Sequence, residues 1–298
     1  RVSYNNIDIT TYRSIKTRIN LDVIDIENKA NKNIQRKAVV GIVFSLFIYF
    51  FIFMYSVQVM KGVIEEKSNR VVEIVISSVT TFQLMMAKII GVGLVGITQF
   101  FILTLVTFTM SITILPKLIP DKYNPAIQID SNNFNASNEI FDSSNEILQF
   151  IIYDIQWSFL IVFFILFFIG GYLLYSGLMA AIGAAVDEEV DSQQFLLPLT
   201  IPMVFAIMMA GKIIDDPSSS ISFWLSEIPF TSPIIMIIRI AMGIGDSSVE
   251  LWEIILSLFL LAITFVGTTW LSSKIYSKGI LSYGKKISYS EIFKWLKS

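Results

Sequence analysis

The 298-residue chain contains no cysteine and no histidine. Disulfides, thiolate or imidazole metal sites, and catalytic pairs that use either side chain are therefore excluded. Charge is also scarce, because charged residues make up 15% of the sequence and the formal net charge is -2. Nor is any basic run long enough to neutralise a phosphate backbone, so we expect no nucleic-acid partner.

Apolar residues dominate instead. The chain is 54% hydrophobic with 24 phenylalanines, and its mean hydropathy is +0.67, outside the range of ordinary soluble domains. A membrane-spanning helix needs roughly 20 apolar residues. The sequence therefore predicts an all-α integral membrane protein, a polytopic helical bundle with spans at residues 38–59, 89–115, 155–186, 193–211 and 254–273.

The remaining segments connect these spans or flank them. Residues 1–37 are predicted to form an extracytoplasmic stalk or an amphipathic segment, and residues 38–273 form the transmembrane domain. Within this domain we expect a charged turn at 61–88, an outer loop at 116–150 and a re-entrant hairpin at 218–245. Pro229 and Pro233 break the hairpin's apolar run, which is too short to cross a bilayer. Pro198 and Pro202 predict a kink in the span 193–211.

Orientation follows from the basic tail, residues 274–298, which favours the cytoplasmic side. The charged turn then lies on the same side. Lysines and arginines near residue 37 also favour the cytoplasmic side. Five spans, however, place the segment before the first span and the tail after the last span on opposite sides. Because the chain begins at Arg1 without an initiator methionine, we expect a sixth, amino-terminal span to precede it and to set that side independently.

Small residues recur at four-residue spacing in the span 155–186. Gly177, Ala181 and Ala185 lie on one helical face, with Ala180 and Ala184 alongside. Small side chains let helix backbones approach closely, so this face is predicted to pack against another span.

Two short motifs raise enzymatic alternatives. Gly279 to Lys286 matches the spacing of a phosphate-binding loop, but it has lysine where a magnesium-binding hydroxyl is needed and follows a membrane helix. A lipid-binding basic tail explains it better. Tyr153-Asp154 and the Gly-x-Gly-Asp sequence that ends at Asp246 resemble intramembrane aspartyl proteases, in which two carboxylates share a proton. This protease and a non-transporting membrane scaffold or sensor remain the alternatives.

The charged turn is the most informative segment. The predicted spans carry no ionisable residue at mid-depth, so a transporter of this kind must take its energy from elsewhere. The turn concentrates charge, and Glu66 and Arg70 have the spacing of a helical ion pair within a predicted helix from Val63 to Ile76. Ser77-Ser78 is expected to end that helix, and Thr80 or Thr81 to cap the next.

The same residues resemble a known family. The order Glu65-Glu66-Lys67, Glu73, Ser77-Ser78, Phe82-Gln83-Leu84, Lys88 and Gly91 is similar to the cytoplasmic coupling segment of type 2 ATP-binding-cassette (ABC) permeases, especially the sodium-exporter-like branch. The run from Gly177 to Pro202, the element Pro229–Pro233 and the tail from Tyr276 to Gly284 are similar to that branch in the same order. The resemblance covers about Ala38 to Leu296. It departs at the amino terminus, where the family's first span is absent.

This resemblance implies a permease subunit of an exporter rather than an enzyme. A second permease chain, identical or different, would pair with it in a multi-pass assembly of the cell membrane, and each chain would contact lipid. A separate ABC ATP-binding subunit would hold ATP and magnesium, with no cofactor or metal on this chain. Contacts to that subunit are expected from Glu65, Glu66, Lys67, Arg70, Glu73, Ser77, Ser78, Lys88, Asp187 and Glu188. Asp191 with Gln194 instead fits a helix-capping box.

Overall fold

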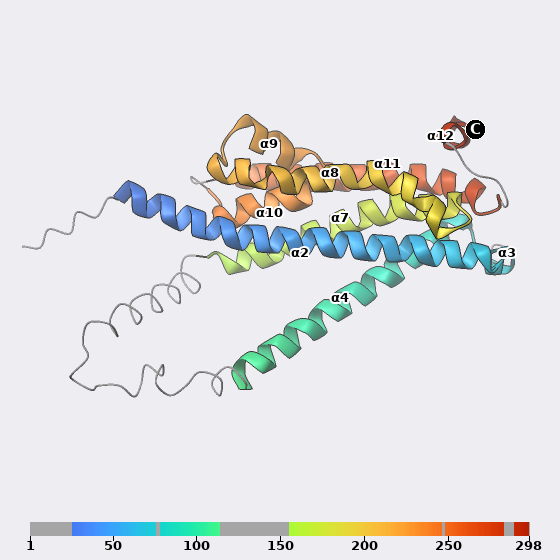
Figure 1. Ribbon diagram of the computed structural model, residues 1–298, viewed down its shortest axis with the longest axis horizontal. Coiled ribbons are helices and arrows are strands. Elements are labelled where there is room, and N and C mark those ends of the chain that lie inside the picture. The colour runs from blue at the N-terminus through green and yellow to red at the C-terminus, as the bar shows by residue number, and fades with distance from the viewer. Residues whose placement is uncertain (1–25, 76–77, 114–154, 246–247, 283–288, 298) are drawn as a thin grey trace, which may run out of the picture. The chain divides into compact units, whose positions relative to one another are not determined.

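The computed structural model describes residues 26–75, 78–113, 155–245, 248–282 and 289–297. The chain divides into two compact units, Arg1–Ile34 and Gln35–Ser298, and the account below concerns the second. The regular structure of the described ranges is helical (Figure 1), with these bounds: α2 (Ile26–Ser68), α3 (Val71–Val75), α4 (Thr81–Thr113), α7 (Trp157–Ala185), α8 (Glu189–Asp215), α9 (Ser220–Glu227), α10 (Ser232–Met242), α11 (Leu251–Gly279) and α12 (Tyr289–Lys297).

Five of the described helices are long and apolar enough to cross a membrane, which confirms the all-α polytopic fold. Their spans are Ile34–Ser68, Thr81–Leu103, Trp157–Ala185, Glu189–Asp215 and Leu251–Gly279. Several helices extend beyond the apolar runs that predicted them. The reason is that glutamate and lysine are good helix formers, so a helix need not end where hydrophobicity ends. α8 likewise continues through Pro198 and Pro202.

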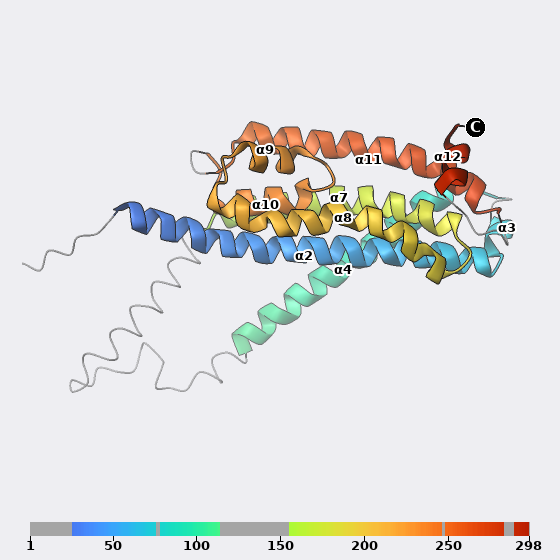
Figure 2. The same cartoon turned by 45° about the horizontal axis from the view of Figure 1, so that its top comes forward.

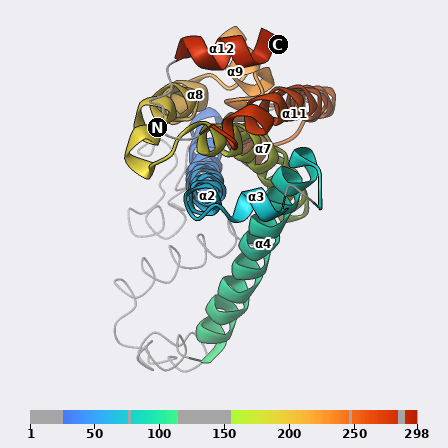
Figure 3. The same ribbon diagram turned by 90° about the vertical axis from the view of Figure 1, so that its right-hand side faces the viewer.

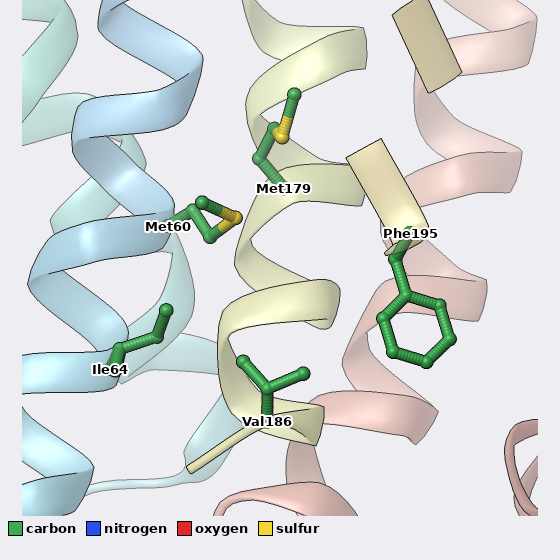
Figure 4. Packing of buried hydrophobic residues seen from close by; sticks show 5 residues of the cluster. All are labelled: Met60, Ile64, Met179, Val186 and Phe195. Atoms are coloured by element: carbon green, nitrogen blue, oxygen red, sulfur yellow. The ribbon is translucent and has the colours of Figure 1, made fainter. Parts of the chain in front are cut away.

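α7 is the central helix of the unit, packing against α4, α8, α10 and α11. Figure 4 shows it between α2 and α11 near one end, where a core of Met60, Ile64, Met179, Val186 and Phe195 joins α2, α7 and α8. The helices α2, α7, α8 and α11 run alongside one another, whereas α4 diverges from them (Figure 2). α2 and α7 are in very close contact. A Cβ atom at Gly183 would lie 2.7 Å from the Met60 carbonyl oxygen.

The small-residue face of α7 is buried in this packing. Gly177, Ala181 and Ala185 are all buried. A Cβ at Gly177 would lie 3.7 Å from Thr269 Oγ1 of α11, so this part of the face is directed at α11. The absence of larger side chains lets the two helices approach.

The segment 218–245 forms two short helices, α9 and α10, of which α10 is buried over its whole length. Hydrogen bonds attach this hairpin to two spans. The Tyr175 hydroxyl of α7 donates to the Phe230 carbonyl oxygen at 2.7 Å, and Ser257 Oγ of α11 donates to the Ser226 carbonyl oxygen at 2.7 Å. The α10 helix has 11 residues, too few to cross a bilayer on its own.

Candidate functional site

Lys67 is buried at the carboxyl end of α2, with 1% of its surface exposed. Its ammonium group donates to the Ala184 and Val186 carbonyl oxygens at 2.9 and 3.2 Å and pairs with Asp187 Oδ1 at 2.9 Å. The last carbonyls of a helix lack intrahelical partners and attract cations. Lys67 therefore satisfies the end of α7 and ties it to the end of α2, 117 residues away in sequence.

Two further ion pairs connect the end of α2 to its neighbours. Glu66 pairs with Lys88 of α4 at 2.7 Å, with side-chain exposures of 34% and 14%. Lys61 pairs with Glu189 of α8 at 2.6 Å, but both side chains are about half exposed. We call Glu66, Lys67, Lys88 and Asp187 the charged junction. It links α2 to α4 and to the turn between α7 and α8.

The predicted helix from Val63 to Ile76 is wrong, because α2 ends at Ser68 and a separate five-residue helix, α3, follows. Arg70 lies between them with φ 54°, a left-handed conformation that costs roughly 1–2 kcal/mol in a residue with a side chain. Glu66 and Arg70 therefore do not lie four residues apart on one helix. Figure 3 shows α3 beside the end of α2 and the start of α4.

The start of α4 confirms a prediction. Gln83 N–H donates to Thr80 Oγ1 at 3.3 Å, and Thr80 N–H donates to Gln83 Oε1 at 3.1 Å. This reciprocal arrangement is a capping box that satisfies two amide groups at the helix start. The capping prediction for Asp191 is wrong: α8 begins at Glu189 with Glu188 at the N-cap, so Asp191 lies in the first turn. The negative charge of Asp191 there still interacts favourably with the positive end of the helix dipole.

The candidate coupling residues fall into two groups by exposure. The buried and half-buried members are the four residues of the charged junction. The exposed members, which face solvent at the same end of the unit, are Glu65, Arg70, Glu73, Ser78 and Glu188. Ser77 lies outside the described residues, as do Asp154, Asp246 and the predicted outer loop 116–150.

Exposed apolar side chains accompany those charges. Val71, Ile74, Val79 and Phe82 are 45%, 76%, 39% and 45% exposed. We call these four residues the apolar patch. Val190 at the start of α8 is also 72% exposed, and sequence reasoning missed it, although its place amid four acidic residues was a visible signal.

The tail lies at this same end, as its charge predicted. A Cβ at Gly279, the last residue of α11, would lie 2.8 Å from the Ala184 carbonyl oxygen. Ile292 of α12 packs against the core around Met60, and Lys278 Nζ donates to the Trp295 carbonyl oxygen at 3.1 Å. The near-match to a phosphate-binding loop thus begins at the end of a long helix rather than after a strand.

Among the described residues, no cluster of three acidic side chains is placed to hold a metal ion. A second buried charge cluster does occur at the other end of the unit, where Arg239 pairs with Glu253 at 2.6 Å. This pair was not predicted from the sequence. The two residues are 14 positions apart with a turn between them, and no local pattern indicates which acid will face the arginine.

Comparison with protein families decides the assignment. Residues 3–274 match the family described as ABC-2 family transporter protein. The chain belongs to the ABC-2 transporter family. It is therefore a multi-pass member of a family of membrane transporter components, as the resemblance of its charged turn predicted.

Two relatives of this ABC-2 chain are both described as uncharacterized proteins. YhaP of Bacillus subtilis is 30% identical over 255 residues, covering 85% of this chain and 54% of its own length. MJ1024 of Methanocaldococcus jannaschii is 24% identical over 289 residues, covering 97% of this chain and 61% of its own length. The chain thus spans a little over half the length of these relatives. No solved structure matches it.

Proposed function

We propose that this chain is the membrane-spanning permease subunit of an ABC exporter and that it couples to a separate ATP-binding subunit through the end that carries the charged junction. The observation that carries the proposal is Lys67, a buried cation that joins the end of α2 to the end of α7. Such a connection can transmit movement from an exposed surface into the spanning helices.

The apolar patch supplies the exposed surface. It belongs to α3, the α3–α4 connection and the start of α4, and the exposed charged residues Arg70 and Glu73 adjoin its members in sequence. Protein interfaces combine an apolar centre with a polar rim in this way. A partner that moves the patch would also move α2 and α4, which the Glu66–Lys88 pair joins directly.

The remaining parts of the proposal follow from the family. ATP and magnesium would be bound by the ATP-binding subunit, and this chain would carry out no hydrolysis. A second permease chain, identical or different, would complete the translocation path in the cell membrane. The apolar outer faces of the spanning helices would contact that chain and membrane lipid.

The experiment is co-purification of the ATP-binding subunit with the permease. Ile74→Asp places a charge at the most exposed residue of the apolar patch. In a complex that buries Ile74, loss of this large apolar side chain costs about 1.5–3 kcal/mol of binding free energy. The affinity of the permease for the ATP-binding subunit should therefore fall at least tenfold. Ile221→Asp is the matched control, because Ile221 is 48% exposed on α9, at the other end of the unit. Equal retention of the ATP-binding subunit by both variants would refute the docking surface.

A further inference from the structure

Glu227, the last residue of α9, is a buried acid. Its residue exposure is 3%, and among the described residues neither carboxylate oxygen has a hydrogen-bond partner. An ionised carboxylate in such a position loses its hydration without compensation, which costs several kcal/mol. A proton removes that penalty, because the neutral acid needs far less solvation.

The neighbouring charges do not neutralise Glu227. Arg239 of α10 is already engaged, pairing with Glu253 of α11 at 2.6 Å and donating to Ser226 Oγ and the Ser248 carbonyl oxygen at 2.7 and 2.8 Å. The cluster therefore contains two carboxyl groups and one guanidinium group. With both carboxyl groups ionised it would carry a net charge of -1, whereas a proton on Glu227 makes it neutral.

The described charged groups on the neighbouring segments are exposed to solvent. At the end of α8, Lys212, Asp215 and Asp216 are exposed, and Glu250 before α11 is exposed as well. Asp246 lies outside the described residues. Burial, together with the charge of Glu253, raises the pKa of Glu227 to about 7, against a smaller opposing effect of Arg239. Glu227 belongs to a short helix that is not one of the five spans.

A cavity of about 560 Å³ reaches two members of this cluster, Arg239 and Glu253, and Glu227 is not among its lining residues. Arg239 and Glu253 line its interior, and the exposed Ser218, Trp224 and Glu250 line its outer part. Water in the cavity can therefore reach the two charged groups that act on Glu227. We propose that Glu227 is a proton-binding site, which exchanges its proton with solvent near neutral pH by way of this cavity.

Loss of the proton has a structural consequence. Ser226, next to Glu227, accepts a hydrogen bond from Arg239 at its side chain and from Ser257 at its carbonyl, so it joins α9 to α10 and α11. An ionised Glu227 competes with Glu253 for Arg239 at this joint. Rising pH therefore weakens the attachment of the α9–α10 hairpin to α11.

The test is an infrared titration of the purified full chain, following the carbonyl band of protonated carboxylic acids in wild type minus Glu227→Gln. We expect a band that disappears with a midpoint near pH 7. Asp215→Asn, a change at an exposed acid of α8 that does not line the cavity, should leave the band and its midpoint unchanged. A midpoint near the ordinary glutamate value of about 4.3, or no band, would overturn the proposal.

Two further measurements separate this site from a merely structural acid. Glu253→Gln should lower the midpoint, because it removes a repulsive charge and frees Arg239 to pair with Glu227; an unchanged midpoint would contradict the proposed coupling. Since the folded-state pKa is raised, wild type should lose thermal stability relative to Glu227→Gln as pH rises from about 4.5 through about 7. A pH-independent difference would argue against the site. Neither result depends on the ATP-binding partner.

Discussion

Lys67 shows how one side chain can define an interface within a membrane protein. Its three donors meet two carbonyl oxygens and one carboxylate, so a fully buried ammonium is satisfied without water. The neighbouring Lys61 makes an ion pair of similar length with Glu189, yet both members of that pair are exposed. Burial, rather than distance, separates a structural ion pair from a weak one.

Removing the Lys67 charge should destabilise the fold. Lys67→Met keeps much of the side-chain volume but leaves the Ala184 carbonyl and Asp187 without their cation, at about 1–3 kcal/mol for each unsatisfied buried group. Lys61→Met is the matched control and should cost no more than about 1 kcal/mol. Thermal unfolding of both variants in detergent measures the difference. Similar losses would show that the Lys67 contacts do not stabilise this end of the unit.

At the same scale, the sequence indicated which residues carry charge but not which are buried. Glu65, Glu66 and Lys67 are adjacent in sequence, yet they differ in role because successive helical positions point about 100° apart. Lys67 faces α7, Glu66 faces α4, and Glu65 faces solvent. The partners at Ala184 and Val186 are supplied by backbone carbonyls, which leave no trace in the sequence.

At the scale of helices, the contact between α2 and α7 depends on Gly183. A methyl group there would lie 2.7 Å from the Met60 carbonyl oxygen and 3.1 Å from Val63 Cβ. The obstacle is backbone, which cannot rotate away as a flexible side chain can. Lys67 lies one helical turn beyond Val63 on α2, and its partner Ala184 directly follows Gly183 on α7, so the geometry of the junction relies on this close approach.

Gly183→Ala should therefore force the helices apart and cost about 1–3 kcal/mol. Gly211→Ala in α8 is the control, because a Cβ at Gly211 meets no atom within 4 Å. Alanine is the better helix former by about 1 kcal/mol, so that variant should be neutral or slightly stabilised. The melting temperature of purified Gly183→Ala should fall, whereas that of Gly211→Ala should stay unchanged or rise slightly. A neutral Gly183→Ala would contradict the packing described for α2 and α7.

Helix positions were predictable from hydrophobicity and helix ends much less so. The apolar run of α2 stops near Val59, but the helix continues to Ser68 and places the charged residues on its last turns. What ends it is the left-handed Arg70, and arginine is not a residue that predicts such a conformation. The cap of α4 was predictable because Thr80 and Gln83 have the spacing of a capping box.

For the whole molecule, composition was enough to predict a polytopic bundle, and five described helices meet the requirements of a span. The basic tail and the charged turn were correctly placed at one end, since both are excluded from hydrocarbon. The pairing of Arg239 with Glu253 and the isolation of Glu227 depend on how α9, α10 and α11 pack. Such long-range arrangements cannot be obtained from a single sequence.

The central claim is that the charged junction transmits ATP-driven movement from the patch to the spanning helices. The most direct test compares permease-dependent ATP hydrolysis in complexes reconstituted with the ATP-binding subunit. Glu66→Lys sets two cations together at the contact with Lys88, and permease-dependent hydrolysis should be lost while the complex still assembles. Glu66→Lys combined with Lys88→Glu restores an ion pair of reversed polarity, and should recover most of the activity. A silent single variant, or a double variant as impaired as the single one, would contradict the account.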